Sequence, residues 1–428
     1  MGATSNPIIA GDGNSPTLTF DSSGNPIGIA NLNGTRANTA ILFGDSFSAR
    51  CHQPGILARQ MDWGYFTWLN VFCNGAFTCI GNYGVSGNTT TQMLARIETA
   101  AAAGASWVFV QGGVNDLSTA TADQIITNLK AICARFVQTG AKVVLCGISP
   151  YTGYAGGYTT ILAVNKAMRE YCNVTPNITF VDVYSSLVNP TDTTGALATG
   201  MSDDALHPSS KGARAYGLAI ANAISGQYTN TNLLVSSAAD AYVIDNTSKQ
   251  ILTNPLMSGT TGTISGTGAS GTLATSWTGG VATGTATAVF TAGVARSDGI
   301  GVDQQIVISG AGAGAVVNIR QTGIGGRAAI GDTLYATGSI TLTGCTDLLY
   351  FQPSIDIVID GATTRSRIMD SASANTDQGD LTIKFRTPDI LLSGTTLTSI
   401  NFFINITFGT SGAGAATVKL GRIGIFKK

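Results

Sequence analysis

The sequence has 428 residues, of which 44% are hydrophobic and only 11% are charged, and its formal net charge is −1. This length predicts two or three domains, and the hydrophobic content is sufficient for buried cores. The balanced charge gives no electrostatic reason to expect a nucleic-acid partner, and the absence of an apolar run of about 18 residues argues against a membrane span.

The first 36 residues are rich in Gly, Asn, Ser and Pro and show little periodicity, so we expect an extended N-terminal arm over residues 1–36. They lack the basic segment followed by an apolar stretch that marks a signal peptide. Export of a mature chain and release of the protein by cell lysis both remain open.

Residues 37–228 alternate short apolar runs with helical patterns. This alternation predicts βαβ units, a parallel sheet and three α/β/α layers, with ligands bound beyond the carboxyl ends of the strands. The expected strands cover residues 40–43, 77–80, 107–111, 142–148 and 178–183, and the expected helices cover residues 91–103, 121–138, 158–172 and 209–225.

Helical periodicity then disappears. We expect a linker over residues 229–249 and a separate domain over residues 250–428. Residues 250–428 contain stretches in which apolar and polar residues alternate, such as INFFINITF and VKLGRIGIF, and turn signals separate these expected strands. This pattern is typical of an antiparallel β-sandwich, and we expect it to be jelly-roll-like.

The chain has seven cysteines, an odd number, and their spacing follows no disulfide or zinc pattern. We interpret most of them as small buried hydrophobic residues, and we expect Cys73 and Cys79 to be unpaired. Neither a metal nor a cofactor is predicted.

Four polar segments belong to one rim of the predicted sheet. Ser46 closes the first strand, residues 84–88 follow the second, residues 112–116 follow the third, and residues 204–208 precede the last helix. A serine hydroxyl becomes a good nucleophile when an imidazole takes its proton. His207 is the candidate base, and Asp204 is the candidate acceptor for the other ring nitrogen.

The tetrahedral intermediate of acyl transfer needs fixed hydrogen-bond donors. The backbone N–H of Ser46, a glycine N–H and the side-chain amide of Asn115 are the candidates. Asp203 is a rival for the role of Asp204, and Asp204 could instead cap the helix that begins near Pro208.

These blocks resemble the SGNH, or GDSL, hydrolase superfamily. The serine block is Gly44-Asp45-Ser46, the glycine block is NYGVSGNTT, the third block is GVND and the fourth is DALH. The resemblance implies a flavodoxin-like fold, metal-free hydrolysis of esters or thioesters, and Ser46, Asp204 and His207 as catalytic residues. It also assigns the oxyanion hole to Ser46, Gly87 and Asn115, with Gly84 as the alternative glycine.

Other residues border the same rim. In YTGYAGGY, which follows the fourth strand, Tyr151 and Tyr154 are candidates for stacking on sugar rings, although a merely flexible loop is an equal alternative. His52 is interpreted as surface or pocket wall.

The C-terminal segments resemble jelly-roll modules of phage tail-fibre and tailspike hydrolases. That resemblance implies removal of O-acetyl groups from a polysaccharide, a location in a virion tail or outside the cell, and a homotrimer. Two alternatives are a lipase- or thioesterase-like hydrolase of small acyl esters and an inactive glycan-binding adhesin.

Overall fold

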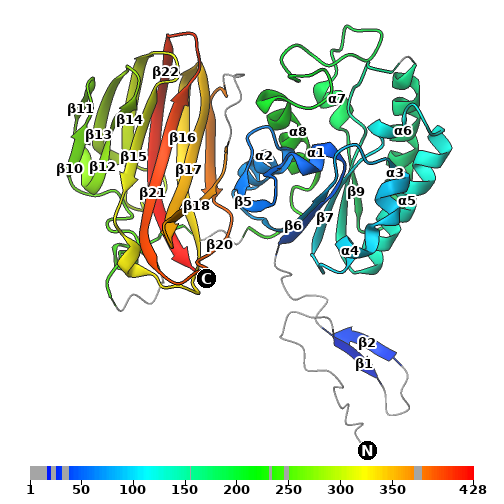
Figure 1. Ribbon diagram of the computed structural model, residues 1–428, viewed down its shortest axis with the longest axis horizontal. Helices are drawn as coiled ribbons and strands as arrows, with labels where there is room; N and C mark the ends of the chain where they lie inside the picture. Colours follow the sequence, from blue (N-terminus) through cyan, green and yellow to red (C-terminus); the bar gives the residue numbers. More distant parts are fainter. Residues whose placement is uncertain are drawn as a thin grey trace, which may run out of the picture.

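The computed structural model describes residues 17–20, 26–30, 38–154, 156–230, 234–244, 250–370 and 378–428. Figure 1 shows an α/β lobe built from the first half of the chain beside a β-sandwich built from the second half. Of the expected arm, β1 (Thr17–Phe20) and β2 (Pro26–Ala30) pair with each other in antiparallel fashion. The rest of residues 1–36, together with residues 231–233 and 245–249 of the expected linker, lies outside the described residues.

The centre of the first lobe is a parallel sheet of five strands in the order β6-β3-β7-β8-β9. This is the flavodoxin-like order 2-1-3-4-5, as expected from the sequence. The strands are β3 (Thr39–Gly44), β6 (Thr78–Gly84), β7 (Trp107–Gln111), β8 (Lys142–Cys146) and β9 (Ile178–Val181).

Helices cover both faces of this sheet (Figure 1). On one side α5 packs against α3 and α6, and on the other α2 packs against α8. The helices are α1 (Ser46–Ala49), α2 (Tyr65–Phe72), α3 (Thr90–Ala95), α4 (Ile97–Ala101), α5 (Ala122–Gln138), α6 (Gly157–Val174), α7 (Val183–Leu187) and α8 (Ser210–Ala223), with a 3-10 turn η1 (Val114–Asp116). Among the described helices, none combines the length and apolar character that crossing a bilayer requires.

The single helix expected over residues 91–103 is two helices, which corrects the prediction. The break falls at Arg96, whose φ of −115° and ψ of 13° are not helical. The periodic pattern continues through the break because both short helices bury the same side, through Met93 in α3 and Ile97 in α4.

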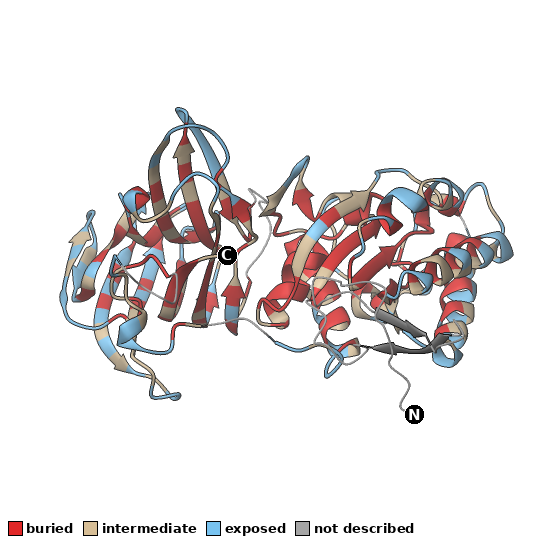
Figure 2. Ribbon diagram, turned by 90° about the horizontal axis from the view of Figure 1, so that it is seen from below, coloured by how far each residue is buried: buried red, intermediate tan, exposed pale blue. Residues whose placement is uncertain are grey.

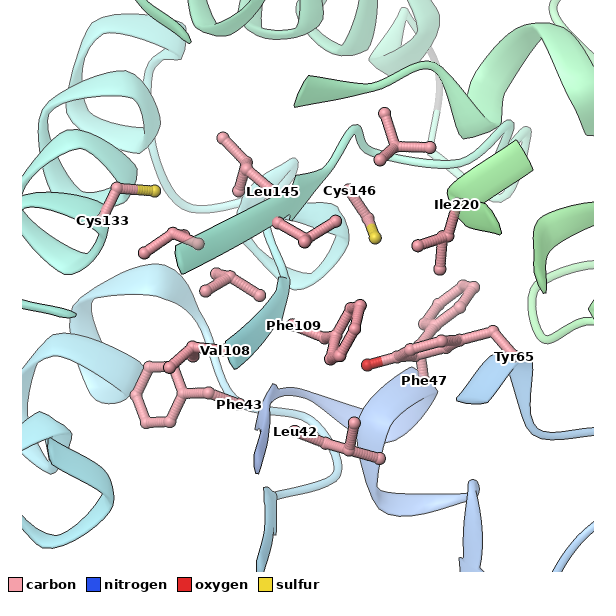
Figure 3. Packing of buried hydrophobic residues seen from close by; sticks show 14 of the residues in the cluster. Leu42, Phe43, Phe47, Tyr65, Val108, Phe109, Cys133, Leu145, Cys146 and Ile220 are labelled. Atoms are coloured by element: carbon pink, nitrogen blue, oxygen red, sulfur yellow. The ribbon is translucent and has the colours of Figure 1, made fainter. Parts of the chain in front are cut away.

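The core of the lobe lies between the sheet and its helices. Figure 3 shows Phe43 and Phe109 from adjacent strands among the packed side chains, with Tyr65 of α2 and Ile220 of α8 from the covering helices. All seven cysteines are free, as expected, and six of them are buried.

The second lobe is an antiparallel-rich sandwich of two sheets, which confirms the predicted fold class. One sheet has the order β10-β12-β15-β21-β17-β18-β5-β4 and the other β11-β13-β14-β22-β16-β19, with β20 paired to β16. Parallel pairs occur at one edge, between β10 and β12 and between β11 and β13. The strands are β10 (Thr261–Ser265), β11 (Ala269–Gly271), β12 (Leu273–Thr283), β13 (Thr287–Ala295), β14 (Val302–Ala311), β15 (Val316–Gln321), β16 (Thr333–Thr346), β17 (Leu348–Ile359), β18 (Ala362–Arg367), β19 (Leu381–Arg386), β20 (Ile390–Leu391), β21 (Leu397–Phe408) and β22 (Gly414–Lys427).

The two lobes are joined through a hairpin of the first one. Strands β4 (His52–Gln53) and β5 (Ile56–Gln60) extend the sandwich sheet, because Arg59 pairs with Arg367 of β18. The fully buried Trp68 of α2 belongs to the hydrophobic cluster of the sandwich, and the backbone N–H of Asp370 donates to the Gln60 carbonyl. Figure 2 shows buried segments on both sides of this junction.

Candidate active site

The site lies where three neighbouring strands end at the same level. Gly44, the last residue of β3, is paired with Gly84 at the end of β6 and with Gln111 at the end of β7. The chain leaves each strand into one of the polar segments singled out in the sequence. Parallel strand ends at one edge of a sheet are where such folds hold their ligands.

Ser46 starts helix α1 immediately after β3. The Asp45 carboxylate accepts a hydrogen bond from the Phe47 backbone N–H at 3.0 Å and so caps this short helix. Ser46 is only 7% exposed, so neighbouring residues enclose most of it at the rim of the sheet.

His207 approaches Ser46 from the loop before α8. Its Nε2 lies 2.7 Å from the Ser46 Oγ, and its Nδ1 lies 2.7 Å from Oδ2 of Asp204. The other carboxylate oxygen, Oδ1, accepts from the backbone N–H groups of Leu206 at 3.0 Å and His207 at 2.7 Å. The tight turn places Ala205 in the left-handed region with φ of 65°.

These contacts set the proton positions. Burial alone would raise the pKa of Asp204, but the hydrogen bonds from the His207 ring and backbone and from Leu206 outweigh it and lower the pKa to about 2. An ionised carboxylate only accepts hydrogen bonds, so Nδ1 of His207 carries the hydrogen. Nε2 is then free to accept the hydroxyl hydrogen of Ser46, as a general base must.

The structure places Asp204, rather than its rival Asp203, against the imidazole. The positively charged Arg50 also contacts this carboxylate, with its Nη1 3.4 Å from Asp204 Oδ2. The Arg50 guanidinium carbon lies 5.7 Å from the centre of the Trp63 ring. Arg50 immediately follows α1, so it links the serine helix to the loop that carries the imidazole.

The two candidate oxyanion glycines differ in their surroundings. The N–H of Gly84 donates to Asn82 Oδ1 at 3.0 Å, and a Cβ at Gly84 would lie 2.1 Å from the backbone nitrogen of Ala49. Close packing therefore leaves no room for a side chain at Gly84, and its N–H already donates a hydrogen bond to Asn82. Gly87 is exposed, has φ of 79° and has open space around the position of a Cβ.

Asn115 lies in the turn after β7. Its Nδ2 donates to the Asn88 carbonyl at 3.1 Å and lies 3.5 Å from Asp45 Oδ2. Asn115 thus spans the segments that carry Ser46 and Gly87. The structure brings the serine segment, the glycine loop and this amide together at one rim.

Two buried carboxyl groups support this rim. Burial raises the pKa of Asp45 to about 7, against the lowering effect of the hydrogen bond from Phe47, and the nearby Asp116 raises it further. Asp116 accepts from the backbone N–H of Thr90 at 2.9 Å and from its hydroxyl at 2.6 Å. It therefore ties the turn after β7 to the start of α3.

Tyr151 and Tyr154 lie on the loop between β8 and α6 and take no part in these contacts. The Tyr151 ring folds back onto its own loop, since a Cβ at Gly153 would lie 2.2 Å from its hydroxyl oxygen, and Tyr154 is 42% exposed. Among the described residues, no three His, Cys, Asp or Glu side chains are grouped as metal ligands would be.

A groove of about 600 Å³ lies beside the glycine loop. Its lining residues come from the β4–β5 hairpin and from β6 with the turn that follows it: Ala49, His52, Gln53, Pro54, Gly55, Ile56, Leu57, Gly81, Asn82, Tyr83, Gly84, Val85 and Ser86. His52 is a buried wall of this groove, where burial lowers its pKa to about 3 and its Nδ1 lies 3.1 Å from Asn82 Nδ2.

Sequence reasoning missed this groove, Arg50 and Arg96. The hairpin strands are too short to show a period, and neither arginine lies in one of the four blocks. Arg96 contacts the Gly44 and Tyr83 carbonyls, which no sequence spacing indicates.

One family model matches the part of the chain that forms the α/β lobe. Residues 42–215 match the family described as GDSL-like Lipase/Acylhydrolase, a span that includes Ser46, Asn115 and His207. No curated protein matches the sequence.

Several solved structures are similar to this chain. They include a GDSL-like lipase from Bacteroides thetaiotaomicron, with 20% identity, a TM-score of 0.38, and coverage of 45% of this chain and 91% of that one. A G-D-S-L family lipolytic protein from Veillonella parvula has 18% identity, a TM-score of 0.35, and coverage of 44% and 98%. A catalytic mutant of an acetylxylan esterase from Geobacillus stearothermophilus has 17% identity, a TM-score of 0.38, and coverage of 46% and 97%.

Proposed function

We propose that this protein, an ester hydrolase whose α/β lobe is a GDSL-type acylhydrolase domain, removes O-acetyl groups from a polysaccharide through an acyl-enzyme on Ser46. The observation that carries the reaction is the pair of 2.7 Å contacts that joins Ser46 Oγ to His207 Nε2 and His207 Nδ1 to Asp204. A weak nucleophile, its base and the orienter of that base are in hydrogen-bond reach of one another.

In the proposed reaction Ser46 Oγ bonds to the ester carbonyl carbon while its proton passes to His207 Nε2. The carbonyl oxygen becomes an oxyanion, which accepts hydrogen bonds from the N–H groups of Ser46 and Gly87 and from the Asn115 amide. Collapse breaks the bond to the sugar oxygen, and the imidazolium protonates that leaving alcohol. Water then attacks the acetyl-serine with His207 again as base, which releases acetate and restores the Ser46 hydroxyl.

The groove supports a sugar as the alcohol part of the substrate. None of the described residues that line it is Asp, Glu, Lys or Arg, so it favours an uncharged ligand. The Tyr83 ring lies on the backbone of Gly81, where a Cβ would be 2.5 Å from the ring, so the ring is supported on one side. An aromatic ring with a hydroxyl edge, beside neutral polar groups such as Gln53 and Ser86, suits the C–H faces and hydroxyls of a sugar.

The same groove favours a second candidate, hydrolysis of esters with longer acyl chains. Ile56 is 40% exposed and Val85 is 43% exposed, and both line the groove. An acyl chain seated there would bury their apolar surface. An inactive glycan-binding adhesin is less well supported, because a binding module has no need for the aligned serine, imidazole and carboxylate.

Two measurements separate these functions. The first compares p-nitrophenyl acetate turnover by the wild type, by Ser46→Ala and by Ser265→Ala, an exposed serine of the sandwich that serves as the control. We expect activity in the wild type and the control only, and activity in Ser46→Ala would contradict the assigned nucleophile. An active wild type would exclude the adhesin.

The second measurement compares acetate release from defined O-acetylated polysaccharides with turnover of p-nitrophenyl esters of increasing chain length. We expect kcat/KM to be highest for an acetylated glycan and to fall as the acyl chain lengthens. A steady rise of kcat/KM with chain length would support the second candidate and contradict deacetylation.

The remaining proposals concern assembly and location. We propose that the protein forms a homotrimer and is located in a virion tail or outside the cell. Both proposals depend on the resemblance of the C-terminal segments to jelly-roll modules of phage tail-fibre and tailspike hydrolases. Light scattering tests the first: a mass of three times 43.8 kDa is expected, and a monomer at micromolar concentration would contradict it.

A further inference from the structure

The Arg96 side chain bridges the ends of the neighbouring strands β3 and β6. Its Nη2 donates to the Gly44 carbonyl, its Nη1 to the Tyr83 carbonyl and its Nε to Asn88 Oδ1, each at 2.7 Å. The guanidinium carbon also lies 4.8 Å from the centre of the Phe43 ring. All of these contacts are made from the residue at which α3 stops and α4 starts.

Two of these hydrogen bonds, to Gly44 and to Asn88, connect Arg96 to the three donors of the proposed oxyanion hole. Gly44 is two residues before Ser46, so its carbonyl fixes the turn that presents the Ser46 N–H. Asn88 follows Gly87, and the Asn88 carbonyl accepts from Asn115 Nδ2 at 3.1 Å. Arg96 therefore contacts the serine turn directly and reaches the glycine loop and the Asn115 amide through Asn88.

We propose that Arg96 is a positioning residue that sets the spacing of the three oxyanion donors, an inference that rests on the proposed ester hydrolysis. Arginine suits this task because its planar guanidinium presents several N–H groups in a rigid fork. A lysine has one flexible ammonium group and cannot hold the same three acceptors at once. Arg96 itself touches neither the nucleophile nor the oxyanion.

The location of the break in the helix supports this role. The Thr90 end of α3 is fixed by Asp116, and the other end stops where the Arg96 side chain reaches the Gly44 and Tyr83 carbonyls. Burial lowers the pKa of Arg96 and the neighbouring Asp45 carboxyl raises it. The guanidinium thus bonds the carbonyls at two strand ends and is close enough to the buried Asp45 carboxyl to influence its charge.

The kinetic consequence follows from geometry. Donors that are displaced by a fraction of an ångström stabilise the oxyanion less, whereas the ground-state ester is bound by other contacts. Loss of Arg96 should therefore lower kcat with little change in KM. It should also weaken the binding of a tetrahedral mimic of the intermediate in the same proportion.

The test compares Arg96→Lys and Arg96→Ala with the wild type and with Arg135→Ala, an arginine of α5 paired to Glu98 at the protein surface. For p-nitrophenyl acetate we expect kcat of both Arg96 variants to fall by about 10²-fold, with KM changed by less than about threefold. The inhibition constant of phenylboronic acid should rise by a similar factor. Added methylguanidinium should partly restore the kcat of Arg96→Ala but not that of Ser46→Ala.

Folded Arg96 variants that keep kcat within about twofold, or that change KM and leave boronate inhibition as in the wild type, would overturn the inference. If Arg96→Ala does not fold, Asn88→Ala decides the question, because it removes one of the three acceptors and leaves the Asn88 carbonyl in place. In Asn88→Ala we expect a smaller fall in kcat and a smaller rise in the inhibition constant of phenylboronic acid than in the Arg96 variants. An unchanged kcat would overturn the inference. A wild type without ester hydrolysis would instead contradict the proposed function itself.

Discussion

Asp204 holds His207 by both the ring and the backbone. Oδ2 of the carboxylate lies 2.7 Å from Nδ1 of the imidazole, and Oδ1 accepts from the backbone N–H of the same histidine at 2.7 Å. The ring cannot turn about its χ angles without losing the first contact. The loop cannot move without losing the second, so one carboxylate fixes both the tautomer and the position of the proposed base.

We predict that Asp204→Asn lowers kcat by about 10³- to 10⁴-fold with little change in KM. The amide nitrogen of Asn would face Nδ1 as a donor and would favour the tautomer whose Nε2 carries hydrogen, which cannot accept the Ser46 proton. Steady-state kinetics with p-nitrophenyl acetate checks this. Asp203→Asn is the control, and a larger loss in that variant would show that the wrong carboxylate has been assigned.

The proposed oxyanion hole predicts that Asn115→Ala lowers kcat by about 10²- to 10³-fold, as loss of one donor does in other hydrolases. KM should change little, because the amide acts on the charge that develops in the transition state. Asn173→Ala, in the last turn of α6, provides an exposed control. If Asn115→Ala raised KM and spared kcat, the amide would be a ground-state contact and the assignment would be wrong.

The raised pKa of Asp45 predicts a pH-dependent loss of stability. Its pKa is about 7 in the folded protein against 3.8 for the free side chain, so between these values the folded state holds a proton that the unfolded state has released. The stabilising contribution is full below pH 4 and is lost as the pH rises through 7. Thermal melts at pH 5 and pH 8 should show a smaller decrease in Tm for Asp45→Asn than for the wild type.

An equal decrease in Tm in the two proteins would mean that Asp45 does not titrate in this range. Asp360→Asn is a suitable control, because that carboxylate lies in the sandwich and hydrogen bonds from Thr395 and Thr396 lower its pKa. It stays ionised from pH 5 to pH 8, so its replacement should leave the pH dependence of the Tm as it is in the wild type.

The shared core predicts that the two lobes depend on each other. Trp68 is fully buried in the sandwich cluster, and its indole N–H donates to the Asp62 carbonyl at 2.6 Å. Trp68→Ala should lower the free energy of unfolding by about 3–5 kcal/mol. Chemical denaturation measures this, with Trp63→Ala, at a partly exposed ring, as the control. Equal effects of the two substitutions would contradict the close packing of the lobes.

Much of the α/β lobe could be predicted from the sequence, because buried parallel strands and amphipathic helices leave strong local patterns. The strand at residues 107–111 is found as expected, and helix α5 begins after Thr121, which accepts from the Gln124 N–H at 3.2 Å. The proximity of Ser46 and His207 could also be predicted from the chain order, which assigns the end of the first strand and the segment before the last helix to one rim of the sheet.

Other features depend on contacts between distant segments that no local pattern reveals. The pairing of Arg59 with Arg367 joins strands about 300 residues apart, and only the folded chain brings them together. The break at Arg96 likewise reflects the bonds to Gly44 and Tyr83, which outweigh the helical periodicity of the segment.

Trapping the acyl-enzyme tests the central claim most directly. The wild type is mixed with p-nitrophenyl acetate, the reaction is quenched in acid within the first turnover, and the digested protein is analysed by mass spectrometry. We predict one acetyl group on the peptide that contains Ser46, and none on that peptide in Ser46→Ala. Rapid ester hydrolysis with the acetyl group on another residue, or with Ser46→Ala as active as the wild type, would contradict the account.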